Sequence, residues 1–211
     1  MKVWRFAVLL FSALFLNNAV EAQVFTQKDV SCTKDADGRL YCEDDASGTP
    51  LNGIIEEYYD NGGVQAQTSW QSGRLNGLSR EYAGDGTLLI ENMWQNGYLN
   101  GVFKEYYDNG SIKTEALYKN NLPNGERKEY YPNGKIQLRG VFKNGKPNGL
   151  IKKYYESGAL KEETTWHNGV ADGAYKEYYG NGRIKVRAML KNGKPVGQTQ
   201  KFDSNGKKIA Q

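Results

Sequence analysis

Short runs in which apolar and polar residues alternate recur along the chain, and turns rich in asparagine and glycine separate them. In "GERKEYYPNGKIQLRGVFKNGKPN", residues 125 to 148, two such runs flank "YPNGK". Runs of this length that carry tyrosine, isoleucine and valine and end at Asn-Gly pairs are typical of β-strands joined in hairpins. The pattern therefore predicts one β-hairpin in each such unit.

The unit recurs every 24 residues, as three glycine series and two aromatic series show. We expect six full repeats over residues 53–196 and a degenerate terminal repeat over 197–211. Stacked edge to edge, such hairpins give an all-β fold: an elongated, single-layer antiparallel sheet. The first glycine series is Gly53, Gly77, Gly101, Gly125, Gly149, Gly173 and Gly197. The second, the turn glycines, is Gly62, Gly86, Gly110, Gly134, Gly158, Gly182 and Gly206.

The turn "YPNGK" predicts how the two strands of a hairpin align. Proline suits the second position of a type I turn, so Pro132 favours a three-residue loop in which Gly134 takes the left-handed conformation. This loop would place Tyr130 opposite Ile136 and Lys128 opposite Leu138. The other turn glycines are expected to do the same in their repeats.

This alignment predicts two different faces for the sheet, because alternate residues share a face. Tyr106, Ile112, Ala116 and Tyr118 would share an apolar face with Tyr154, Leu160 and Trp166, while Glu105, Tyr107, Lys113 and Glu115 would lie on the other. Lysines at one repeat position are expected to interrupt the apolar face with their aliphatic stems, namely Lys104, Lys128, Lys152 and Lys176.

The second tyrosine of each Tyr-Tyr pair is the candidate binding residue, because exposed tyrosines offer a large contact area at a small entropy cost. The alternative is that these tyrosines only stiffen the sheet by cross-strand packing. The candidate binding face consists of Tyr59, Tyr107, Tyr131, Tyr155 and Tyr179 with Lys113, Lys161 and Lys185.

The first 22 residues have the pattern of a secretory signal peptide: Lys2 and Arg5 precede an 11-residue apolar run, and small residues follow at Val20 and Ala22. Export favours a disulfide between Cys32 and Cys42. The turn signal Asp37-Gly38 lies between them, so residues 23–52 are expected to form a disulfide-stapled N-terminal cap.

A calcium loop is the alternative for this segment, because Asp35, Asp37, Gly38 and Asp44 fall at EF-hand spacing. Thr33 at the first ligand position and Cys42 inside the loop favour the plain hairpin.

The repeat unit, "GxxxEYYxNGxIKxxxxWxNGKxN", resembles the bacterial variant of the MORN repeat over residues 53 to 210. The resemblance implies an extended hairpin ribbon that associates with proteins or lipids and has no catalytic centre. Members of this type are often described as YwqK-type antitoxin components, which implies a third possibility: neutralising a partner toxin by binding it.

Residues able to perform catalysis are scarce. His167 is the only histidine, and the recurring glutamates form a series rather than a pair. Phosphate-binding glycine motifs do not occur in the sequence. We expect no catalytic, cofactor or metal site.

Charge separates the chain into two parts. Residues 23–100 hold five Lys or Arg and 12 Asp or Glu, whereas residues 101–211 hold 21 and 11. The basic part suits an acidic protein, an anionic membrane or an envelope polymer. Nucleic acid is not expected for an exported chain. The sequence therefore predicts an exported, non-catalytic scaffold for protein partners, with a carbohydrate- or envelope-polymer-binding repeat protein as the alternative; it leaves the oligomeric state open.

Overall fold

The computed structural model describes residues 22–209. The predicted signal peptide, residues 1–22, lies outside this range except for its last residue. Within residues 22–209, none of the helical segments is long and apolar enough to span a bilayer.

Most of the described chain is β-structure. One short 3-10 helix, η1 (Gln27–Asp29), follows the first strand. The strands are β1 (Val24–Thr26), β2 (Val30–Lys34), β3 (Leu40–Asp44), β4 (Thr49–Pro50), β5 (Gly53–Tyr58), β6 (Val64–Gln71), β7 (Arg74–Tyr82), β8 (Leu88–Gln95), β9 (Tyr98–Tyr106), β10 (Ile112–Lys119), β11 (Leu122–Tyr130), β12 (Ile136–Lys143), β13 (Lys146–Pro147), β14 (Gly149–Tyr154), β15 (Leu160–His167), β16 (Val170–Tyr178), β17 (Ile184–Lys191) and β18 (Lys194–Lys201).

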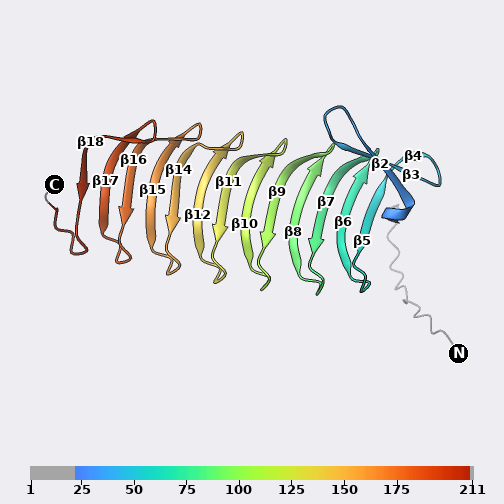
Figure 1. The fold of residues 1–211 in the computed structure, drawn as a ribbon, viewed down its shortest axis with the longest axis horizontal. Helices are drawn as coiled ribbons and strands as arrows, with labels where there is room; N and C mark the ends of the chain where they lie inside the picture. Colours follow the sequence, from blue (N-terminus) through green and yellow to red (C-terminus); the bar gives the residue numbers. More distant parts are fainter. Residues whose placement is uncertain (1–21, 210–211) are drawn as a thin grey trace, which may run out of the picture.

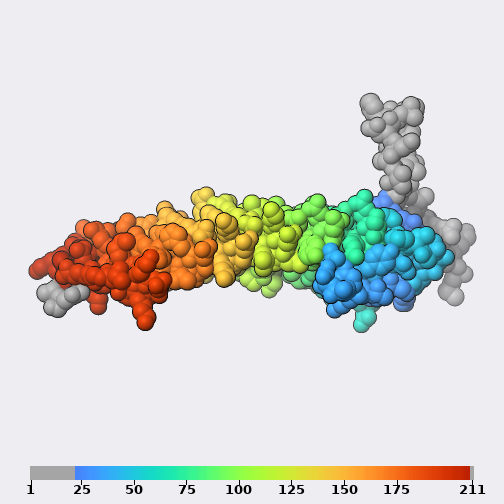
Figure 2. Space-filling view, turned by 90° about the horizontal axis from the view of Figure 1, so that it is seen from above, coloured from blue at the N-terminus to red at the C-terminus, as the bar shows by residue number. Residues whose placement is uncertain are grey.

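Strands β5 to β18 form one sheet in chain order, in which consecutive long strands pair antiparallel and β13 pairs with β12. Strand β1 adds to β5 in parallel at the N-terminal end, and β2, β3 and β4 form a separate small sheet. Figure 1 shows the hairpins side by side in a row, with curved strands. From above, the molecule is long and narrow, and the small sheet bulges from one side of its N-terminal end (Figure 2). The predicted fold class is thus confirmed.

Two kinds of turn line the two long edges of the sheet. At one edge, Gly134 closes a three-residue loop: the N–H of Tyr131 donates to the carbonyl of Lys135, and Gly134 has φ 79°. The seven turn glycines all have φ between 77° and 93°, the left-handed region. At the opposite edge, two-residue turns such as Asn144-Gly145 have positive φ at both positions (50° and 79°), which is the type I′ geometry that suits twisted hairpins.

The predicted alignment of the strands is right at the loop and wrong beyond it. Tyr130 lies opposite Ile136 as expected, but Lys128 lies opposite Arg139 rather than Leu138. The reason is a β-bulge next to the loop, which shifts the pairing between Glu129 and Tyr130 by one residue. The same shift occurs in the other hairpins.

The bulge changes which side chains share a face. Ala116 and Tyr118 lie opposite Phe103 and Gly101, whereas Tyr106 lies on the other side of the sheet. We call the side that carries Trp70, Trp94, Tyr118, Phe142, Trp166 and Leu190 the tryptophan face.

The opposite side, the ladder face, carries a row of mostly charged residues, one from each strand. Lys104, Lys128, Lys152 and Lys176 belong to this row, so the prediction that they interrupt the apolar face is wrong. Tyr154 likewise lies on the ladder face and not with Trp166. The row consists of Glu56, Gln67, Arg80, Glu91, Lys104, Glu115, Lys128, Arg139, Lys152, Glu163, Lys176, Arg187 and Gln200.

The first glycine series has a steric cause. Gly101 has φ 127°, a backbone conformation that residues with a side chain rarely adopt, and a Cβ there would lie 3.0 Å from the Cβ of Met93. Gly77, Gly125 and Gly173 have similar φ values and equally close neighbours. At these four positions the glycine is therefore required by the close approach of consecutive strands beside the turn.

Burial is greatest at the N-terminal end, where the small sheet covers the first hairpins. Phe25, Cys42, Leu51, Ile55 and Trp70 form one buried cluster. The sulfur atoms of Cys32 and Cys42 lie at disulfide distance and join β2 to β3. The loop between these strands holds three residues, Ala36 to Gly38, rather than the expected two, since the N–H of Asp35 donates to the carbonyl of Arg39. Residues 23–52 thus cover the free edge and end of β5.

Candidate binding surface

The five tyrosines of the candidate binding face lie in a row beside the three-residue loops, and each one reaches into the next repeat. Their side chains are half-buried, and every hydroxyl donates a hydrogen bond to the backbone carbonyl 23 residues further on. The pairs are Tyr59–Tyr82 (2.7 Å), Tyr107–Tyr130 (2.7 Å), Tyr131–Tyr154 (2.8 Å), Tyr155–Tyr178 (2.8 Å) and Tyr179–Phe202 (2.9 Å).

The three lysines of this face stand over tyrosine rings. The Nζ atoms of Lys113, Lys161 and Lys185 lie 5.9, 5.5 and 5.9 Å from the ring centres of Tyr107, Tyr155 and Tyr179, within the range of a cation–π contact. Lys113 and Lys185 also pair with glutamates, each at 2.7 Å, and these hydrogen bonds raise the pKa of both lysines. The glutamates are Glu105 and Glu177.

The structure therefore brings the predicted residues together, but their polar atoms bind other parts of the same chain. The hydroxyls form hydrogen bonds from one repeat to the next, and the ammonium group of a lysine lies over three of the rings. This geometry is what the stiffening alternative requires. Whether the row also binds a partner stays a prediction.

Asparagines at the loop tips add a second bond between repeats. The side-chain N–H of Asn133 donates to the carbonyl of Glu156 at 3.2 Å, while its Oδ1 accepts from the N–H of Lys135 at 3.0 Å. Asn61, Asn109 and Asn181 bind the next loop in the same way.

The second repeat lacks both the tyrosine and the asparagine hydrogen bond to the next loop. It carries Ala83 where the others have tyrosine, and Asp85, whose carboxylate has no N–H to donate, where most have asparagine. Among residues 22–209, no side-chain bond joins this loop to the loop of the third repeat, although β8 and β9 pair along their length.

The charged row of the ladder face is held by cross-strand ion pairs. Arg80 pairs with Glu91 at 3.0 Å, and Lys176 pairs with Glu163 at 3.0 Å. Glu163 also accepts a hydrogen bond from Tyr178 at 2.6 Å. Burial and this bond raise the pKa of Tyr178 to about 12. From Lys128 onward the row is mainly basic, and Arg187 has no carboxylate partner among the described ion pairs.

An exposed apolar row runs beside the charged row on the ladder face. Its side chains keep between 38% and 54% of their surface exposed, and Glu126, Thr165 and Ala174 occupy the positions between them. The row begins on β8 in the second repeat and ends on β18 in the last, and most strands between them contribute one apolar residue. The apolar row consists of Met93, Val102, Leu117, Val141, Leu150, Met189 and Val196.

Sequence reasoning missed this row because, without the bulge, Val102 and Leu150 would share the face of the aromatic series instead of lying beside Leu117 and Val141. A signal was nevertheless present. Val102 and Leu150 directly follow glycines of the first series, and Met93, Leu117 and Val141 directly precede Trp94, Tyr118 and Phe142. Positions next to the aromatic series must face the opposite side of the sheet, so a regular apolar residue there indicates an apolar stripe on that side.

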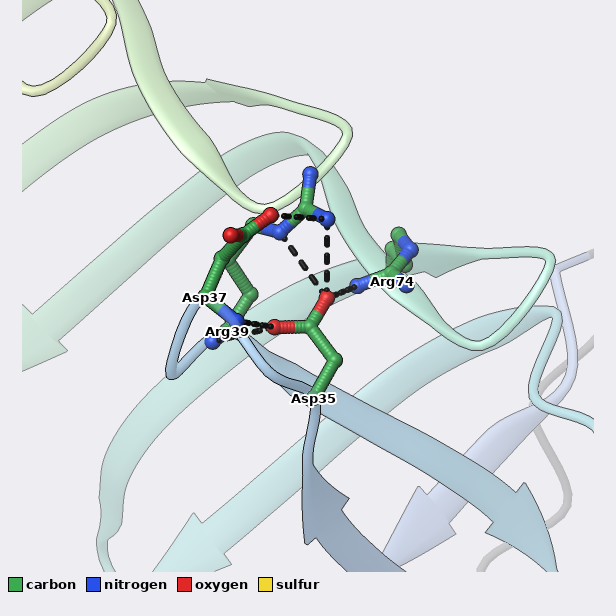
Figure 3. A network of polar contacts seen from close by, with 4 residues as sticks. All are labelled: Asp35, Asp37, Arg39 and Arg74. Atoms are coloured by element: carbon green, nitrogen blue, oxygen red, sulfur yellow. Dashed lines mark hydrogen bonds and ion pairs between the residues drawn. The ribbon is translucent and has the colours of Figure 1, made fainter.

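A polar network fixes the small sheet to the repeats (Figure 3). The carboxylate of Asp35 binds Arg39 at 2.9 Å and Arg74 of β7 at 2.8 Å, and Asp37 binds Arg39 at 3.0 Å. Partial burial opposes ionisation of Asp35, but hydrogen bonds from Arg39, Arg74 and the N–H of Asp37 outweigh it and lower its pKa to about 2. Arg39 also stands over Tyr98, 5.0 Å from the ring centre.

Two of the three acidic residues considered for calcium, Asp35 and Asp37, are thus paired with arginines, and Asp44 accepts hydrogen bonds from the N–H of Ala46 and the hydroxyl of Ser47. Within residues 22–209, no group of three or more His, Cys, Asp or Glu side chains is placed to hold a metal ion. His167 is exposed beside a two-residue turn, where its Nδ1 lies 3.0 Å from the carbonyl of Asp172.

Comparison with known families identifies the repeats. The family described as MORN repeat variant matches residues 51–72, 99–120, 123–144, 147–168 and 171–192, which together make up more than half of the chain. The second repeat, which lacks the tyrosine and asparagine ties, falls outside the matched segments. No curated protein matches the chain.

Proposed function

We propose that this chain, which belongs to the MORN repeat variant family, is an exported, non-catalytic scaffold that binds a protein partner on its ladder face. One observation carries the proposal: the apolar row stays about half exposed along a single-layer sheet. Exposed apolar side chains that gather into patches, as Met93, Val102 and Leu117 do, mark an interaction site more often than a solvated face.

Two further features support a scaffold. The repeats form one continuous sheet with bonds between neighbouring loops, so a partner meets an extended, ordered surface. The disulfide-distance pair Cys32 and Cys42 supports export, because such bonds persist in oxidising compartments. Export predicts that the isolated mature protein begins at Gln23, which mass spectrometry would test.

Site-specific photo-crosslinking tests the binding function. A photo-crosslinking amino acid replaces Val141 in the apolar row or, as a control, Val170, which is similarly exposed (48% and 43%) but lies beside a two-residue turn. In the cells that make this protein, we expect a discrete protein adduct from position 141 and none from position 170. Equal labelling at both positions, or no adduct at either, would contradict the proposal.

The other proposed roles differ in what they bind. Neutralising a toxin would be one form of the same function and would yield the toxin as the adduct at position 141. Binding of carbohydrate or an envelope polymer needs aromatic platforms, and three of the loop tyrosines already carry a lysine. A glycan array with the mature chain distinguishes this role, since only the carbohydrate alternative predicts a positive signal.

A further inference from the structure

The ladder face carries three shallow hollows at equivalent places in different repeats. Five residues that line the first, of 190 Å³, are Val102, Glu115, Leu117, Glu126 and Lys128. The residues 24 positions later in the chain line the second hollow, of 270 Å³, and the residues 72 positions later line the third, of 420 Å³. The second hollow thus lies one repeat from the first, and the third lies three repeats from it. The second set is Glu126, Arg139, Val141, Leu150 and Lys152, and the third is Ala174, Arg187, Met189, Gln198 and Gln200.

Each hollow combines an apolar floor with a charged rim. Val141 and Leu150 in the second hollow are 48% and 45% exposed, and Met189 in the third is 54% exposed. Their neighbours across the hollow come from the charged row. Each site can therefore take one apolar side chain and present ionic groups to the residues beside it.

The rim charges change along the ribbon. Two glutamates and one lysine line the first hollow, whereas the third has Lys176 and Arg187 and no carboxylate. Arg187 lies over the ring of Phe202 and forms none of the described ion pairs, so its charge is available to a ligand. The third hollow, at the C-terminal end, therefore suits a partner with acidic residues.

The spacing of the hollows selects the conformation of the partner. One repeat advances the sheet by two strands, or about 9.6 Å at 4.8 Å per strand. A polyproline II segment has three residues per turn and advances about 9.3 Å per turn, so side chains three residues apart meet the first and second hollows. The third hollow lies two repeats beyond the second and meets a side chain six residues further on. An α-helix presents the same face after seven residues, about 10.5 Å, and falls out of step by about 3 Å over three repeats.

We propose that the ladder face of the third to sixth repeats binds an extended acidic peptide in the polyproline II conformation. The peptide lies across the strands, along the long axis of the sheet, and its apolar side chains recur at every third residue. The first, second and fourth of them are seated in the three hollows. An acidic residue beside the C-terminal anchor pairs with Arg187, whereas Arg139 and Lys152 already pair with Glu126 (2.6 Å) and Glu163 (3.9 Å). This inference rests on the proposed function and specifies the class of its partner.

Binding of synthetic peptides to the mature chain tests the inference. The probe is four Leu-Pro-Glu triplets, and its control is an isomer of the same composition with leucine at every second position followed by the remaining residues. We expect the triplet peptide to bind about tenfold more tightly in isothermal titration. Equal affinity of the two isomers would overturn the assigned spacing.

Paired variants locate the binding site. Val141→Ser with Leu150→Ser should weaken binding of the triplet peptide about tenfold, whereas Leu122→Ser with Val170→Ser should leave it unchanged. All four side chains are similarly exposed, and the control pair lies at the two-residue turns. Equal loss in both variants would overturn the assignment to the hollows. Circular dichroism confirms that each variant is folded.

Other results separate the two proposals. A protein adduct at position 141 combined with no binding of either peptide would leave the scaffold function standing and overturn the extended-peptide partner. Binding to phosphatidylglycerol vesicles in the absence of peptide binding would also overturn it, in favour of a lipid surface.

Discussion

The hydroxyl of Tyr131 donates a 2.8 Å hydrogen bond to the backbone carbonyl of Tyr154, the first tyrosine of the following repeat. The bond joins the loop after β11 to the last residue of β14, beyond the strand pairing of β12 with β14 that ends at Leu138 and Lys153. Equivalent bonds at four other places make the second tyrosine of each pair a tie between neighbouring repeats.

Tyr131→Phe should lower the free energy of unfolding by about 0.5–1.5 kcal/mol, because it removes one hydrogen bond and keeps the ring. Urea unfolding measures the change. Tyr106→Phe is the control, since the Tyr106 hydroxyl forms none of the described hydrogen bonds, and its stability should match the wild type. A stable Tyr131→Phe variant would show that the bond adds nothing in solution.

Ala83→Tyr should have the opposite effect. The second repeat lacks the tie, and a tyrosine at position 83 can donate to the carbonyl of Tyr106 as Tyr59 does to Tyr82. We expect a gain of about 0.5–1.5 kcal/mol in urea unfolding. Ala83→Phe separates the bond from the packing of the ring: if both variants are equally stabilised, the hydroxyl is not responsible.

Gly101→Ala should destabilise the protein by about 1–3 kcal/mol, since the new Cβ meets Met93 at 3.0 Å and alanine must adopt a φ of 127°. Gly84→Ala is the matched control. Gly84 has no positive φ, and a Cβ added there would have no heavy atom within 4 Å, so thermal unfolding should be almost unchanged. Similar loss in the two variants would contradict the steric origin of the glycine period.

The contacts of Asp35 predict a pH dependence. Its pKa of about 2 in the folded protein lies below the ordinary value of about 3.9, so its contribution to stability is complete above about pH 4 and is lost as the pH falls towards 2. Asp35→Asn should therefore be less stable than the wild type at pH 6, and the two melting temperatures should converge near pH 2. Asp108→Asn, in an exposed loop, should show no such convergence; a constant difference for Asp35→Asn would refute the assignment.

The sequence predicted the fold because one unit is repeated with little variation. The 24-residue glycine series and the Pro132 loop were enough to predict hairpins, their order and the pairing of Tyr130 with Ile136. They did not reveal the bulge, because a one-residue shift between Glu129 and Tyr130 leaves the sequence pattern of the strands intact while exchanging their faces.

The binding surface was harder to predict for the same reason. Tyr131 was expected to point to solvent, and only the structure shows that its hydroxyl reaches the next loop. Val141 and Leu150 drew no attention, because their exposure depends on which face the bulge gives them. A long-range partner such as Tyr154 cannot be read from spacing within one repeat.

At the three-residue loops, the tyrosine and asparagine bonds between neighbouring loops all run in one direction, from a donor in one repeat to a carbonyl in the next. Removal of one whole unit, such as residues 123–146, would bring Tyr107 before the carbonyl of Tyr154 in place of that of Tyr130, and every donor would keep an acceptor. A deletion whose length is not a multiple of 24 residues would leave some of these donors without the equivalent acceptor carbonyl. The length of this molecule can therefore change in evolution by whole repeats, and with it the number of residues of a ligand that it can hold.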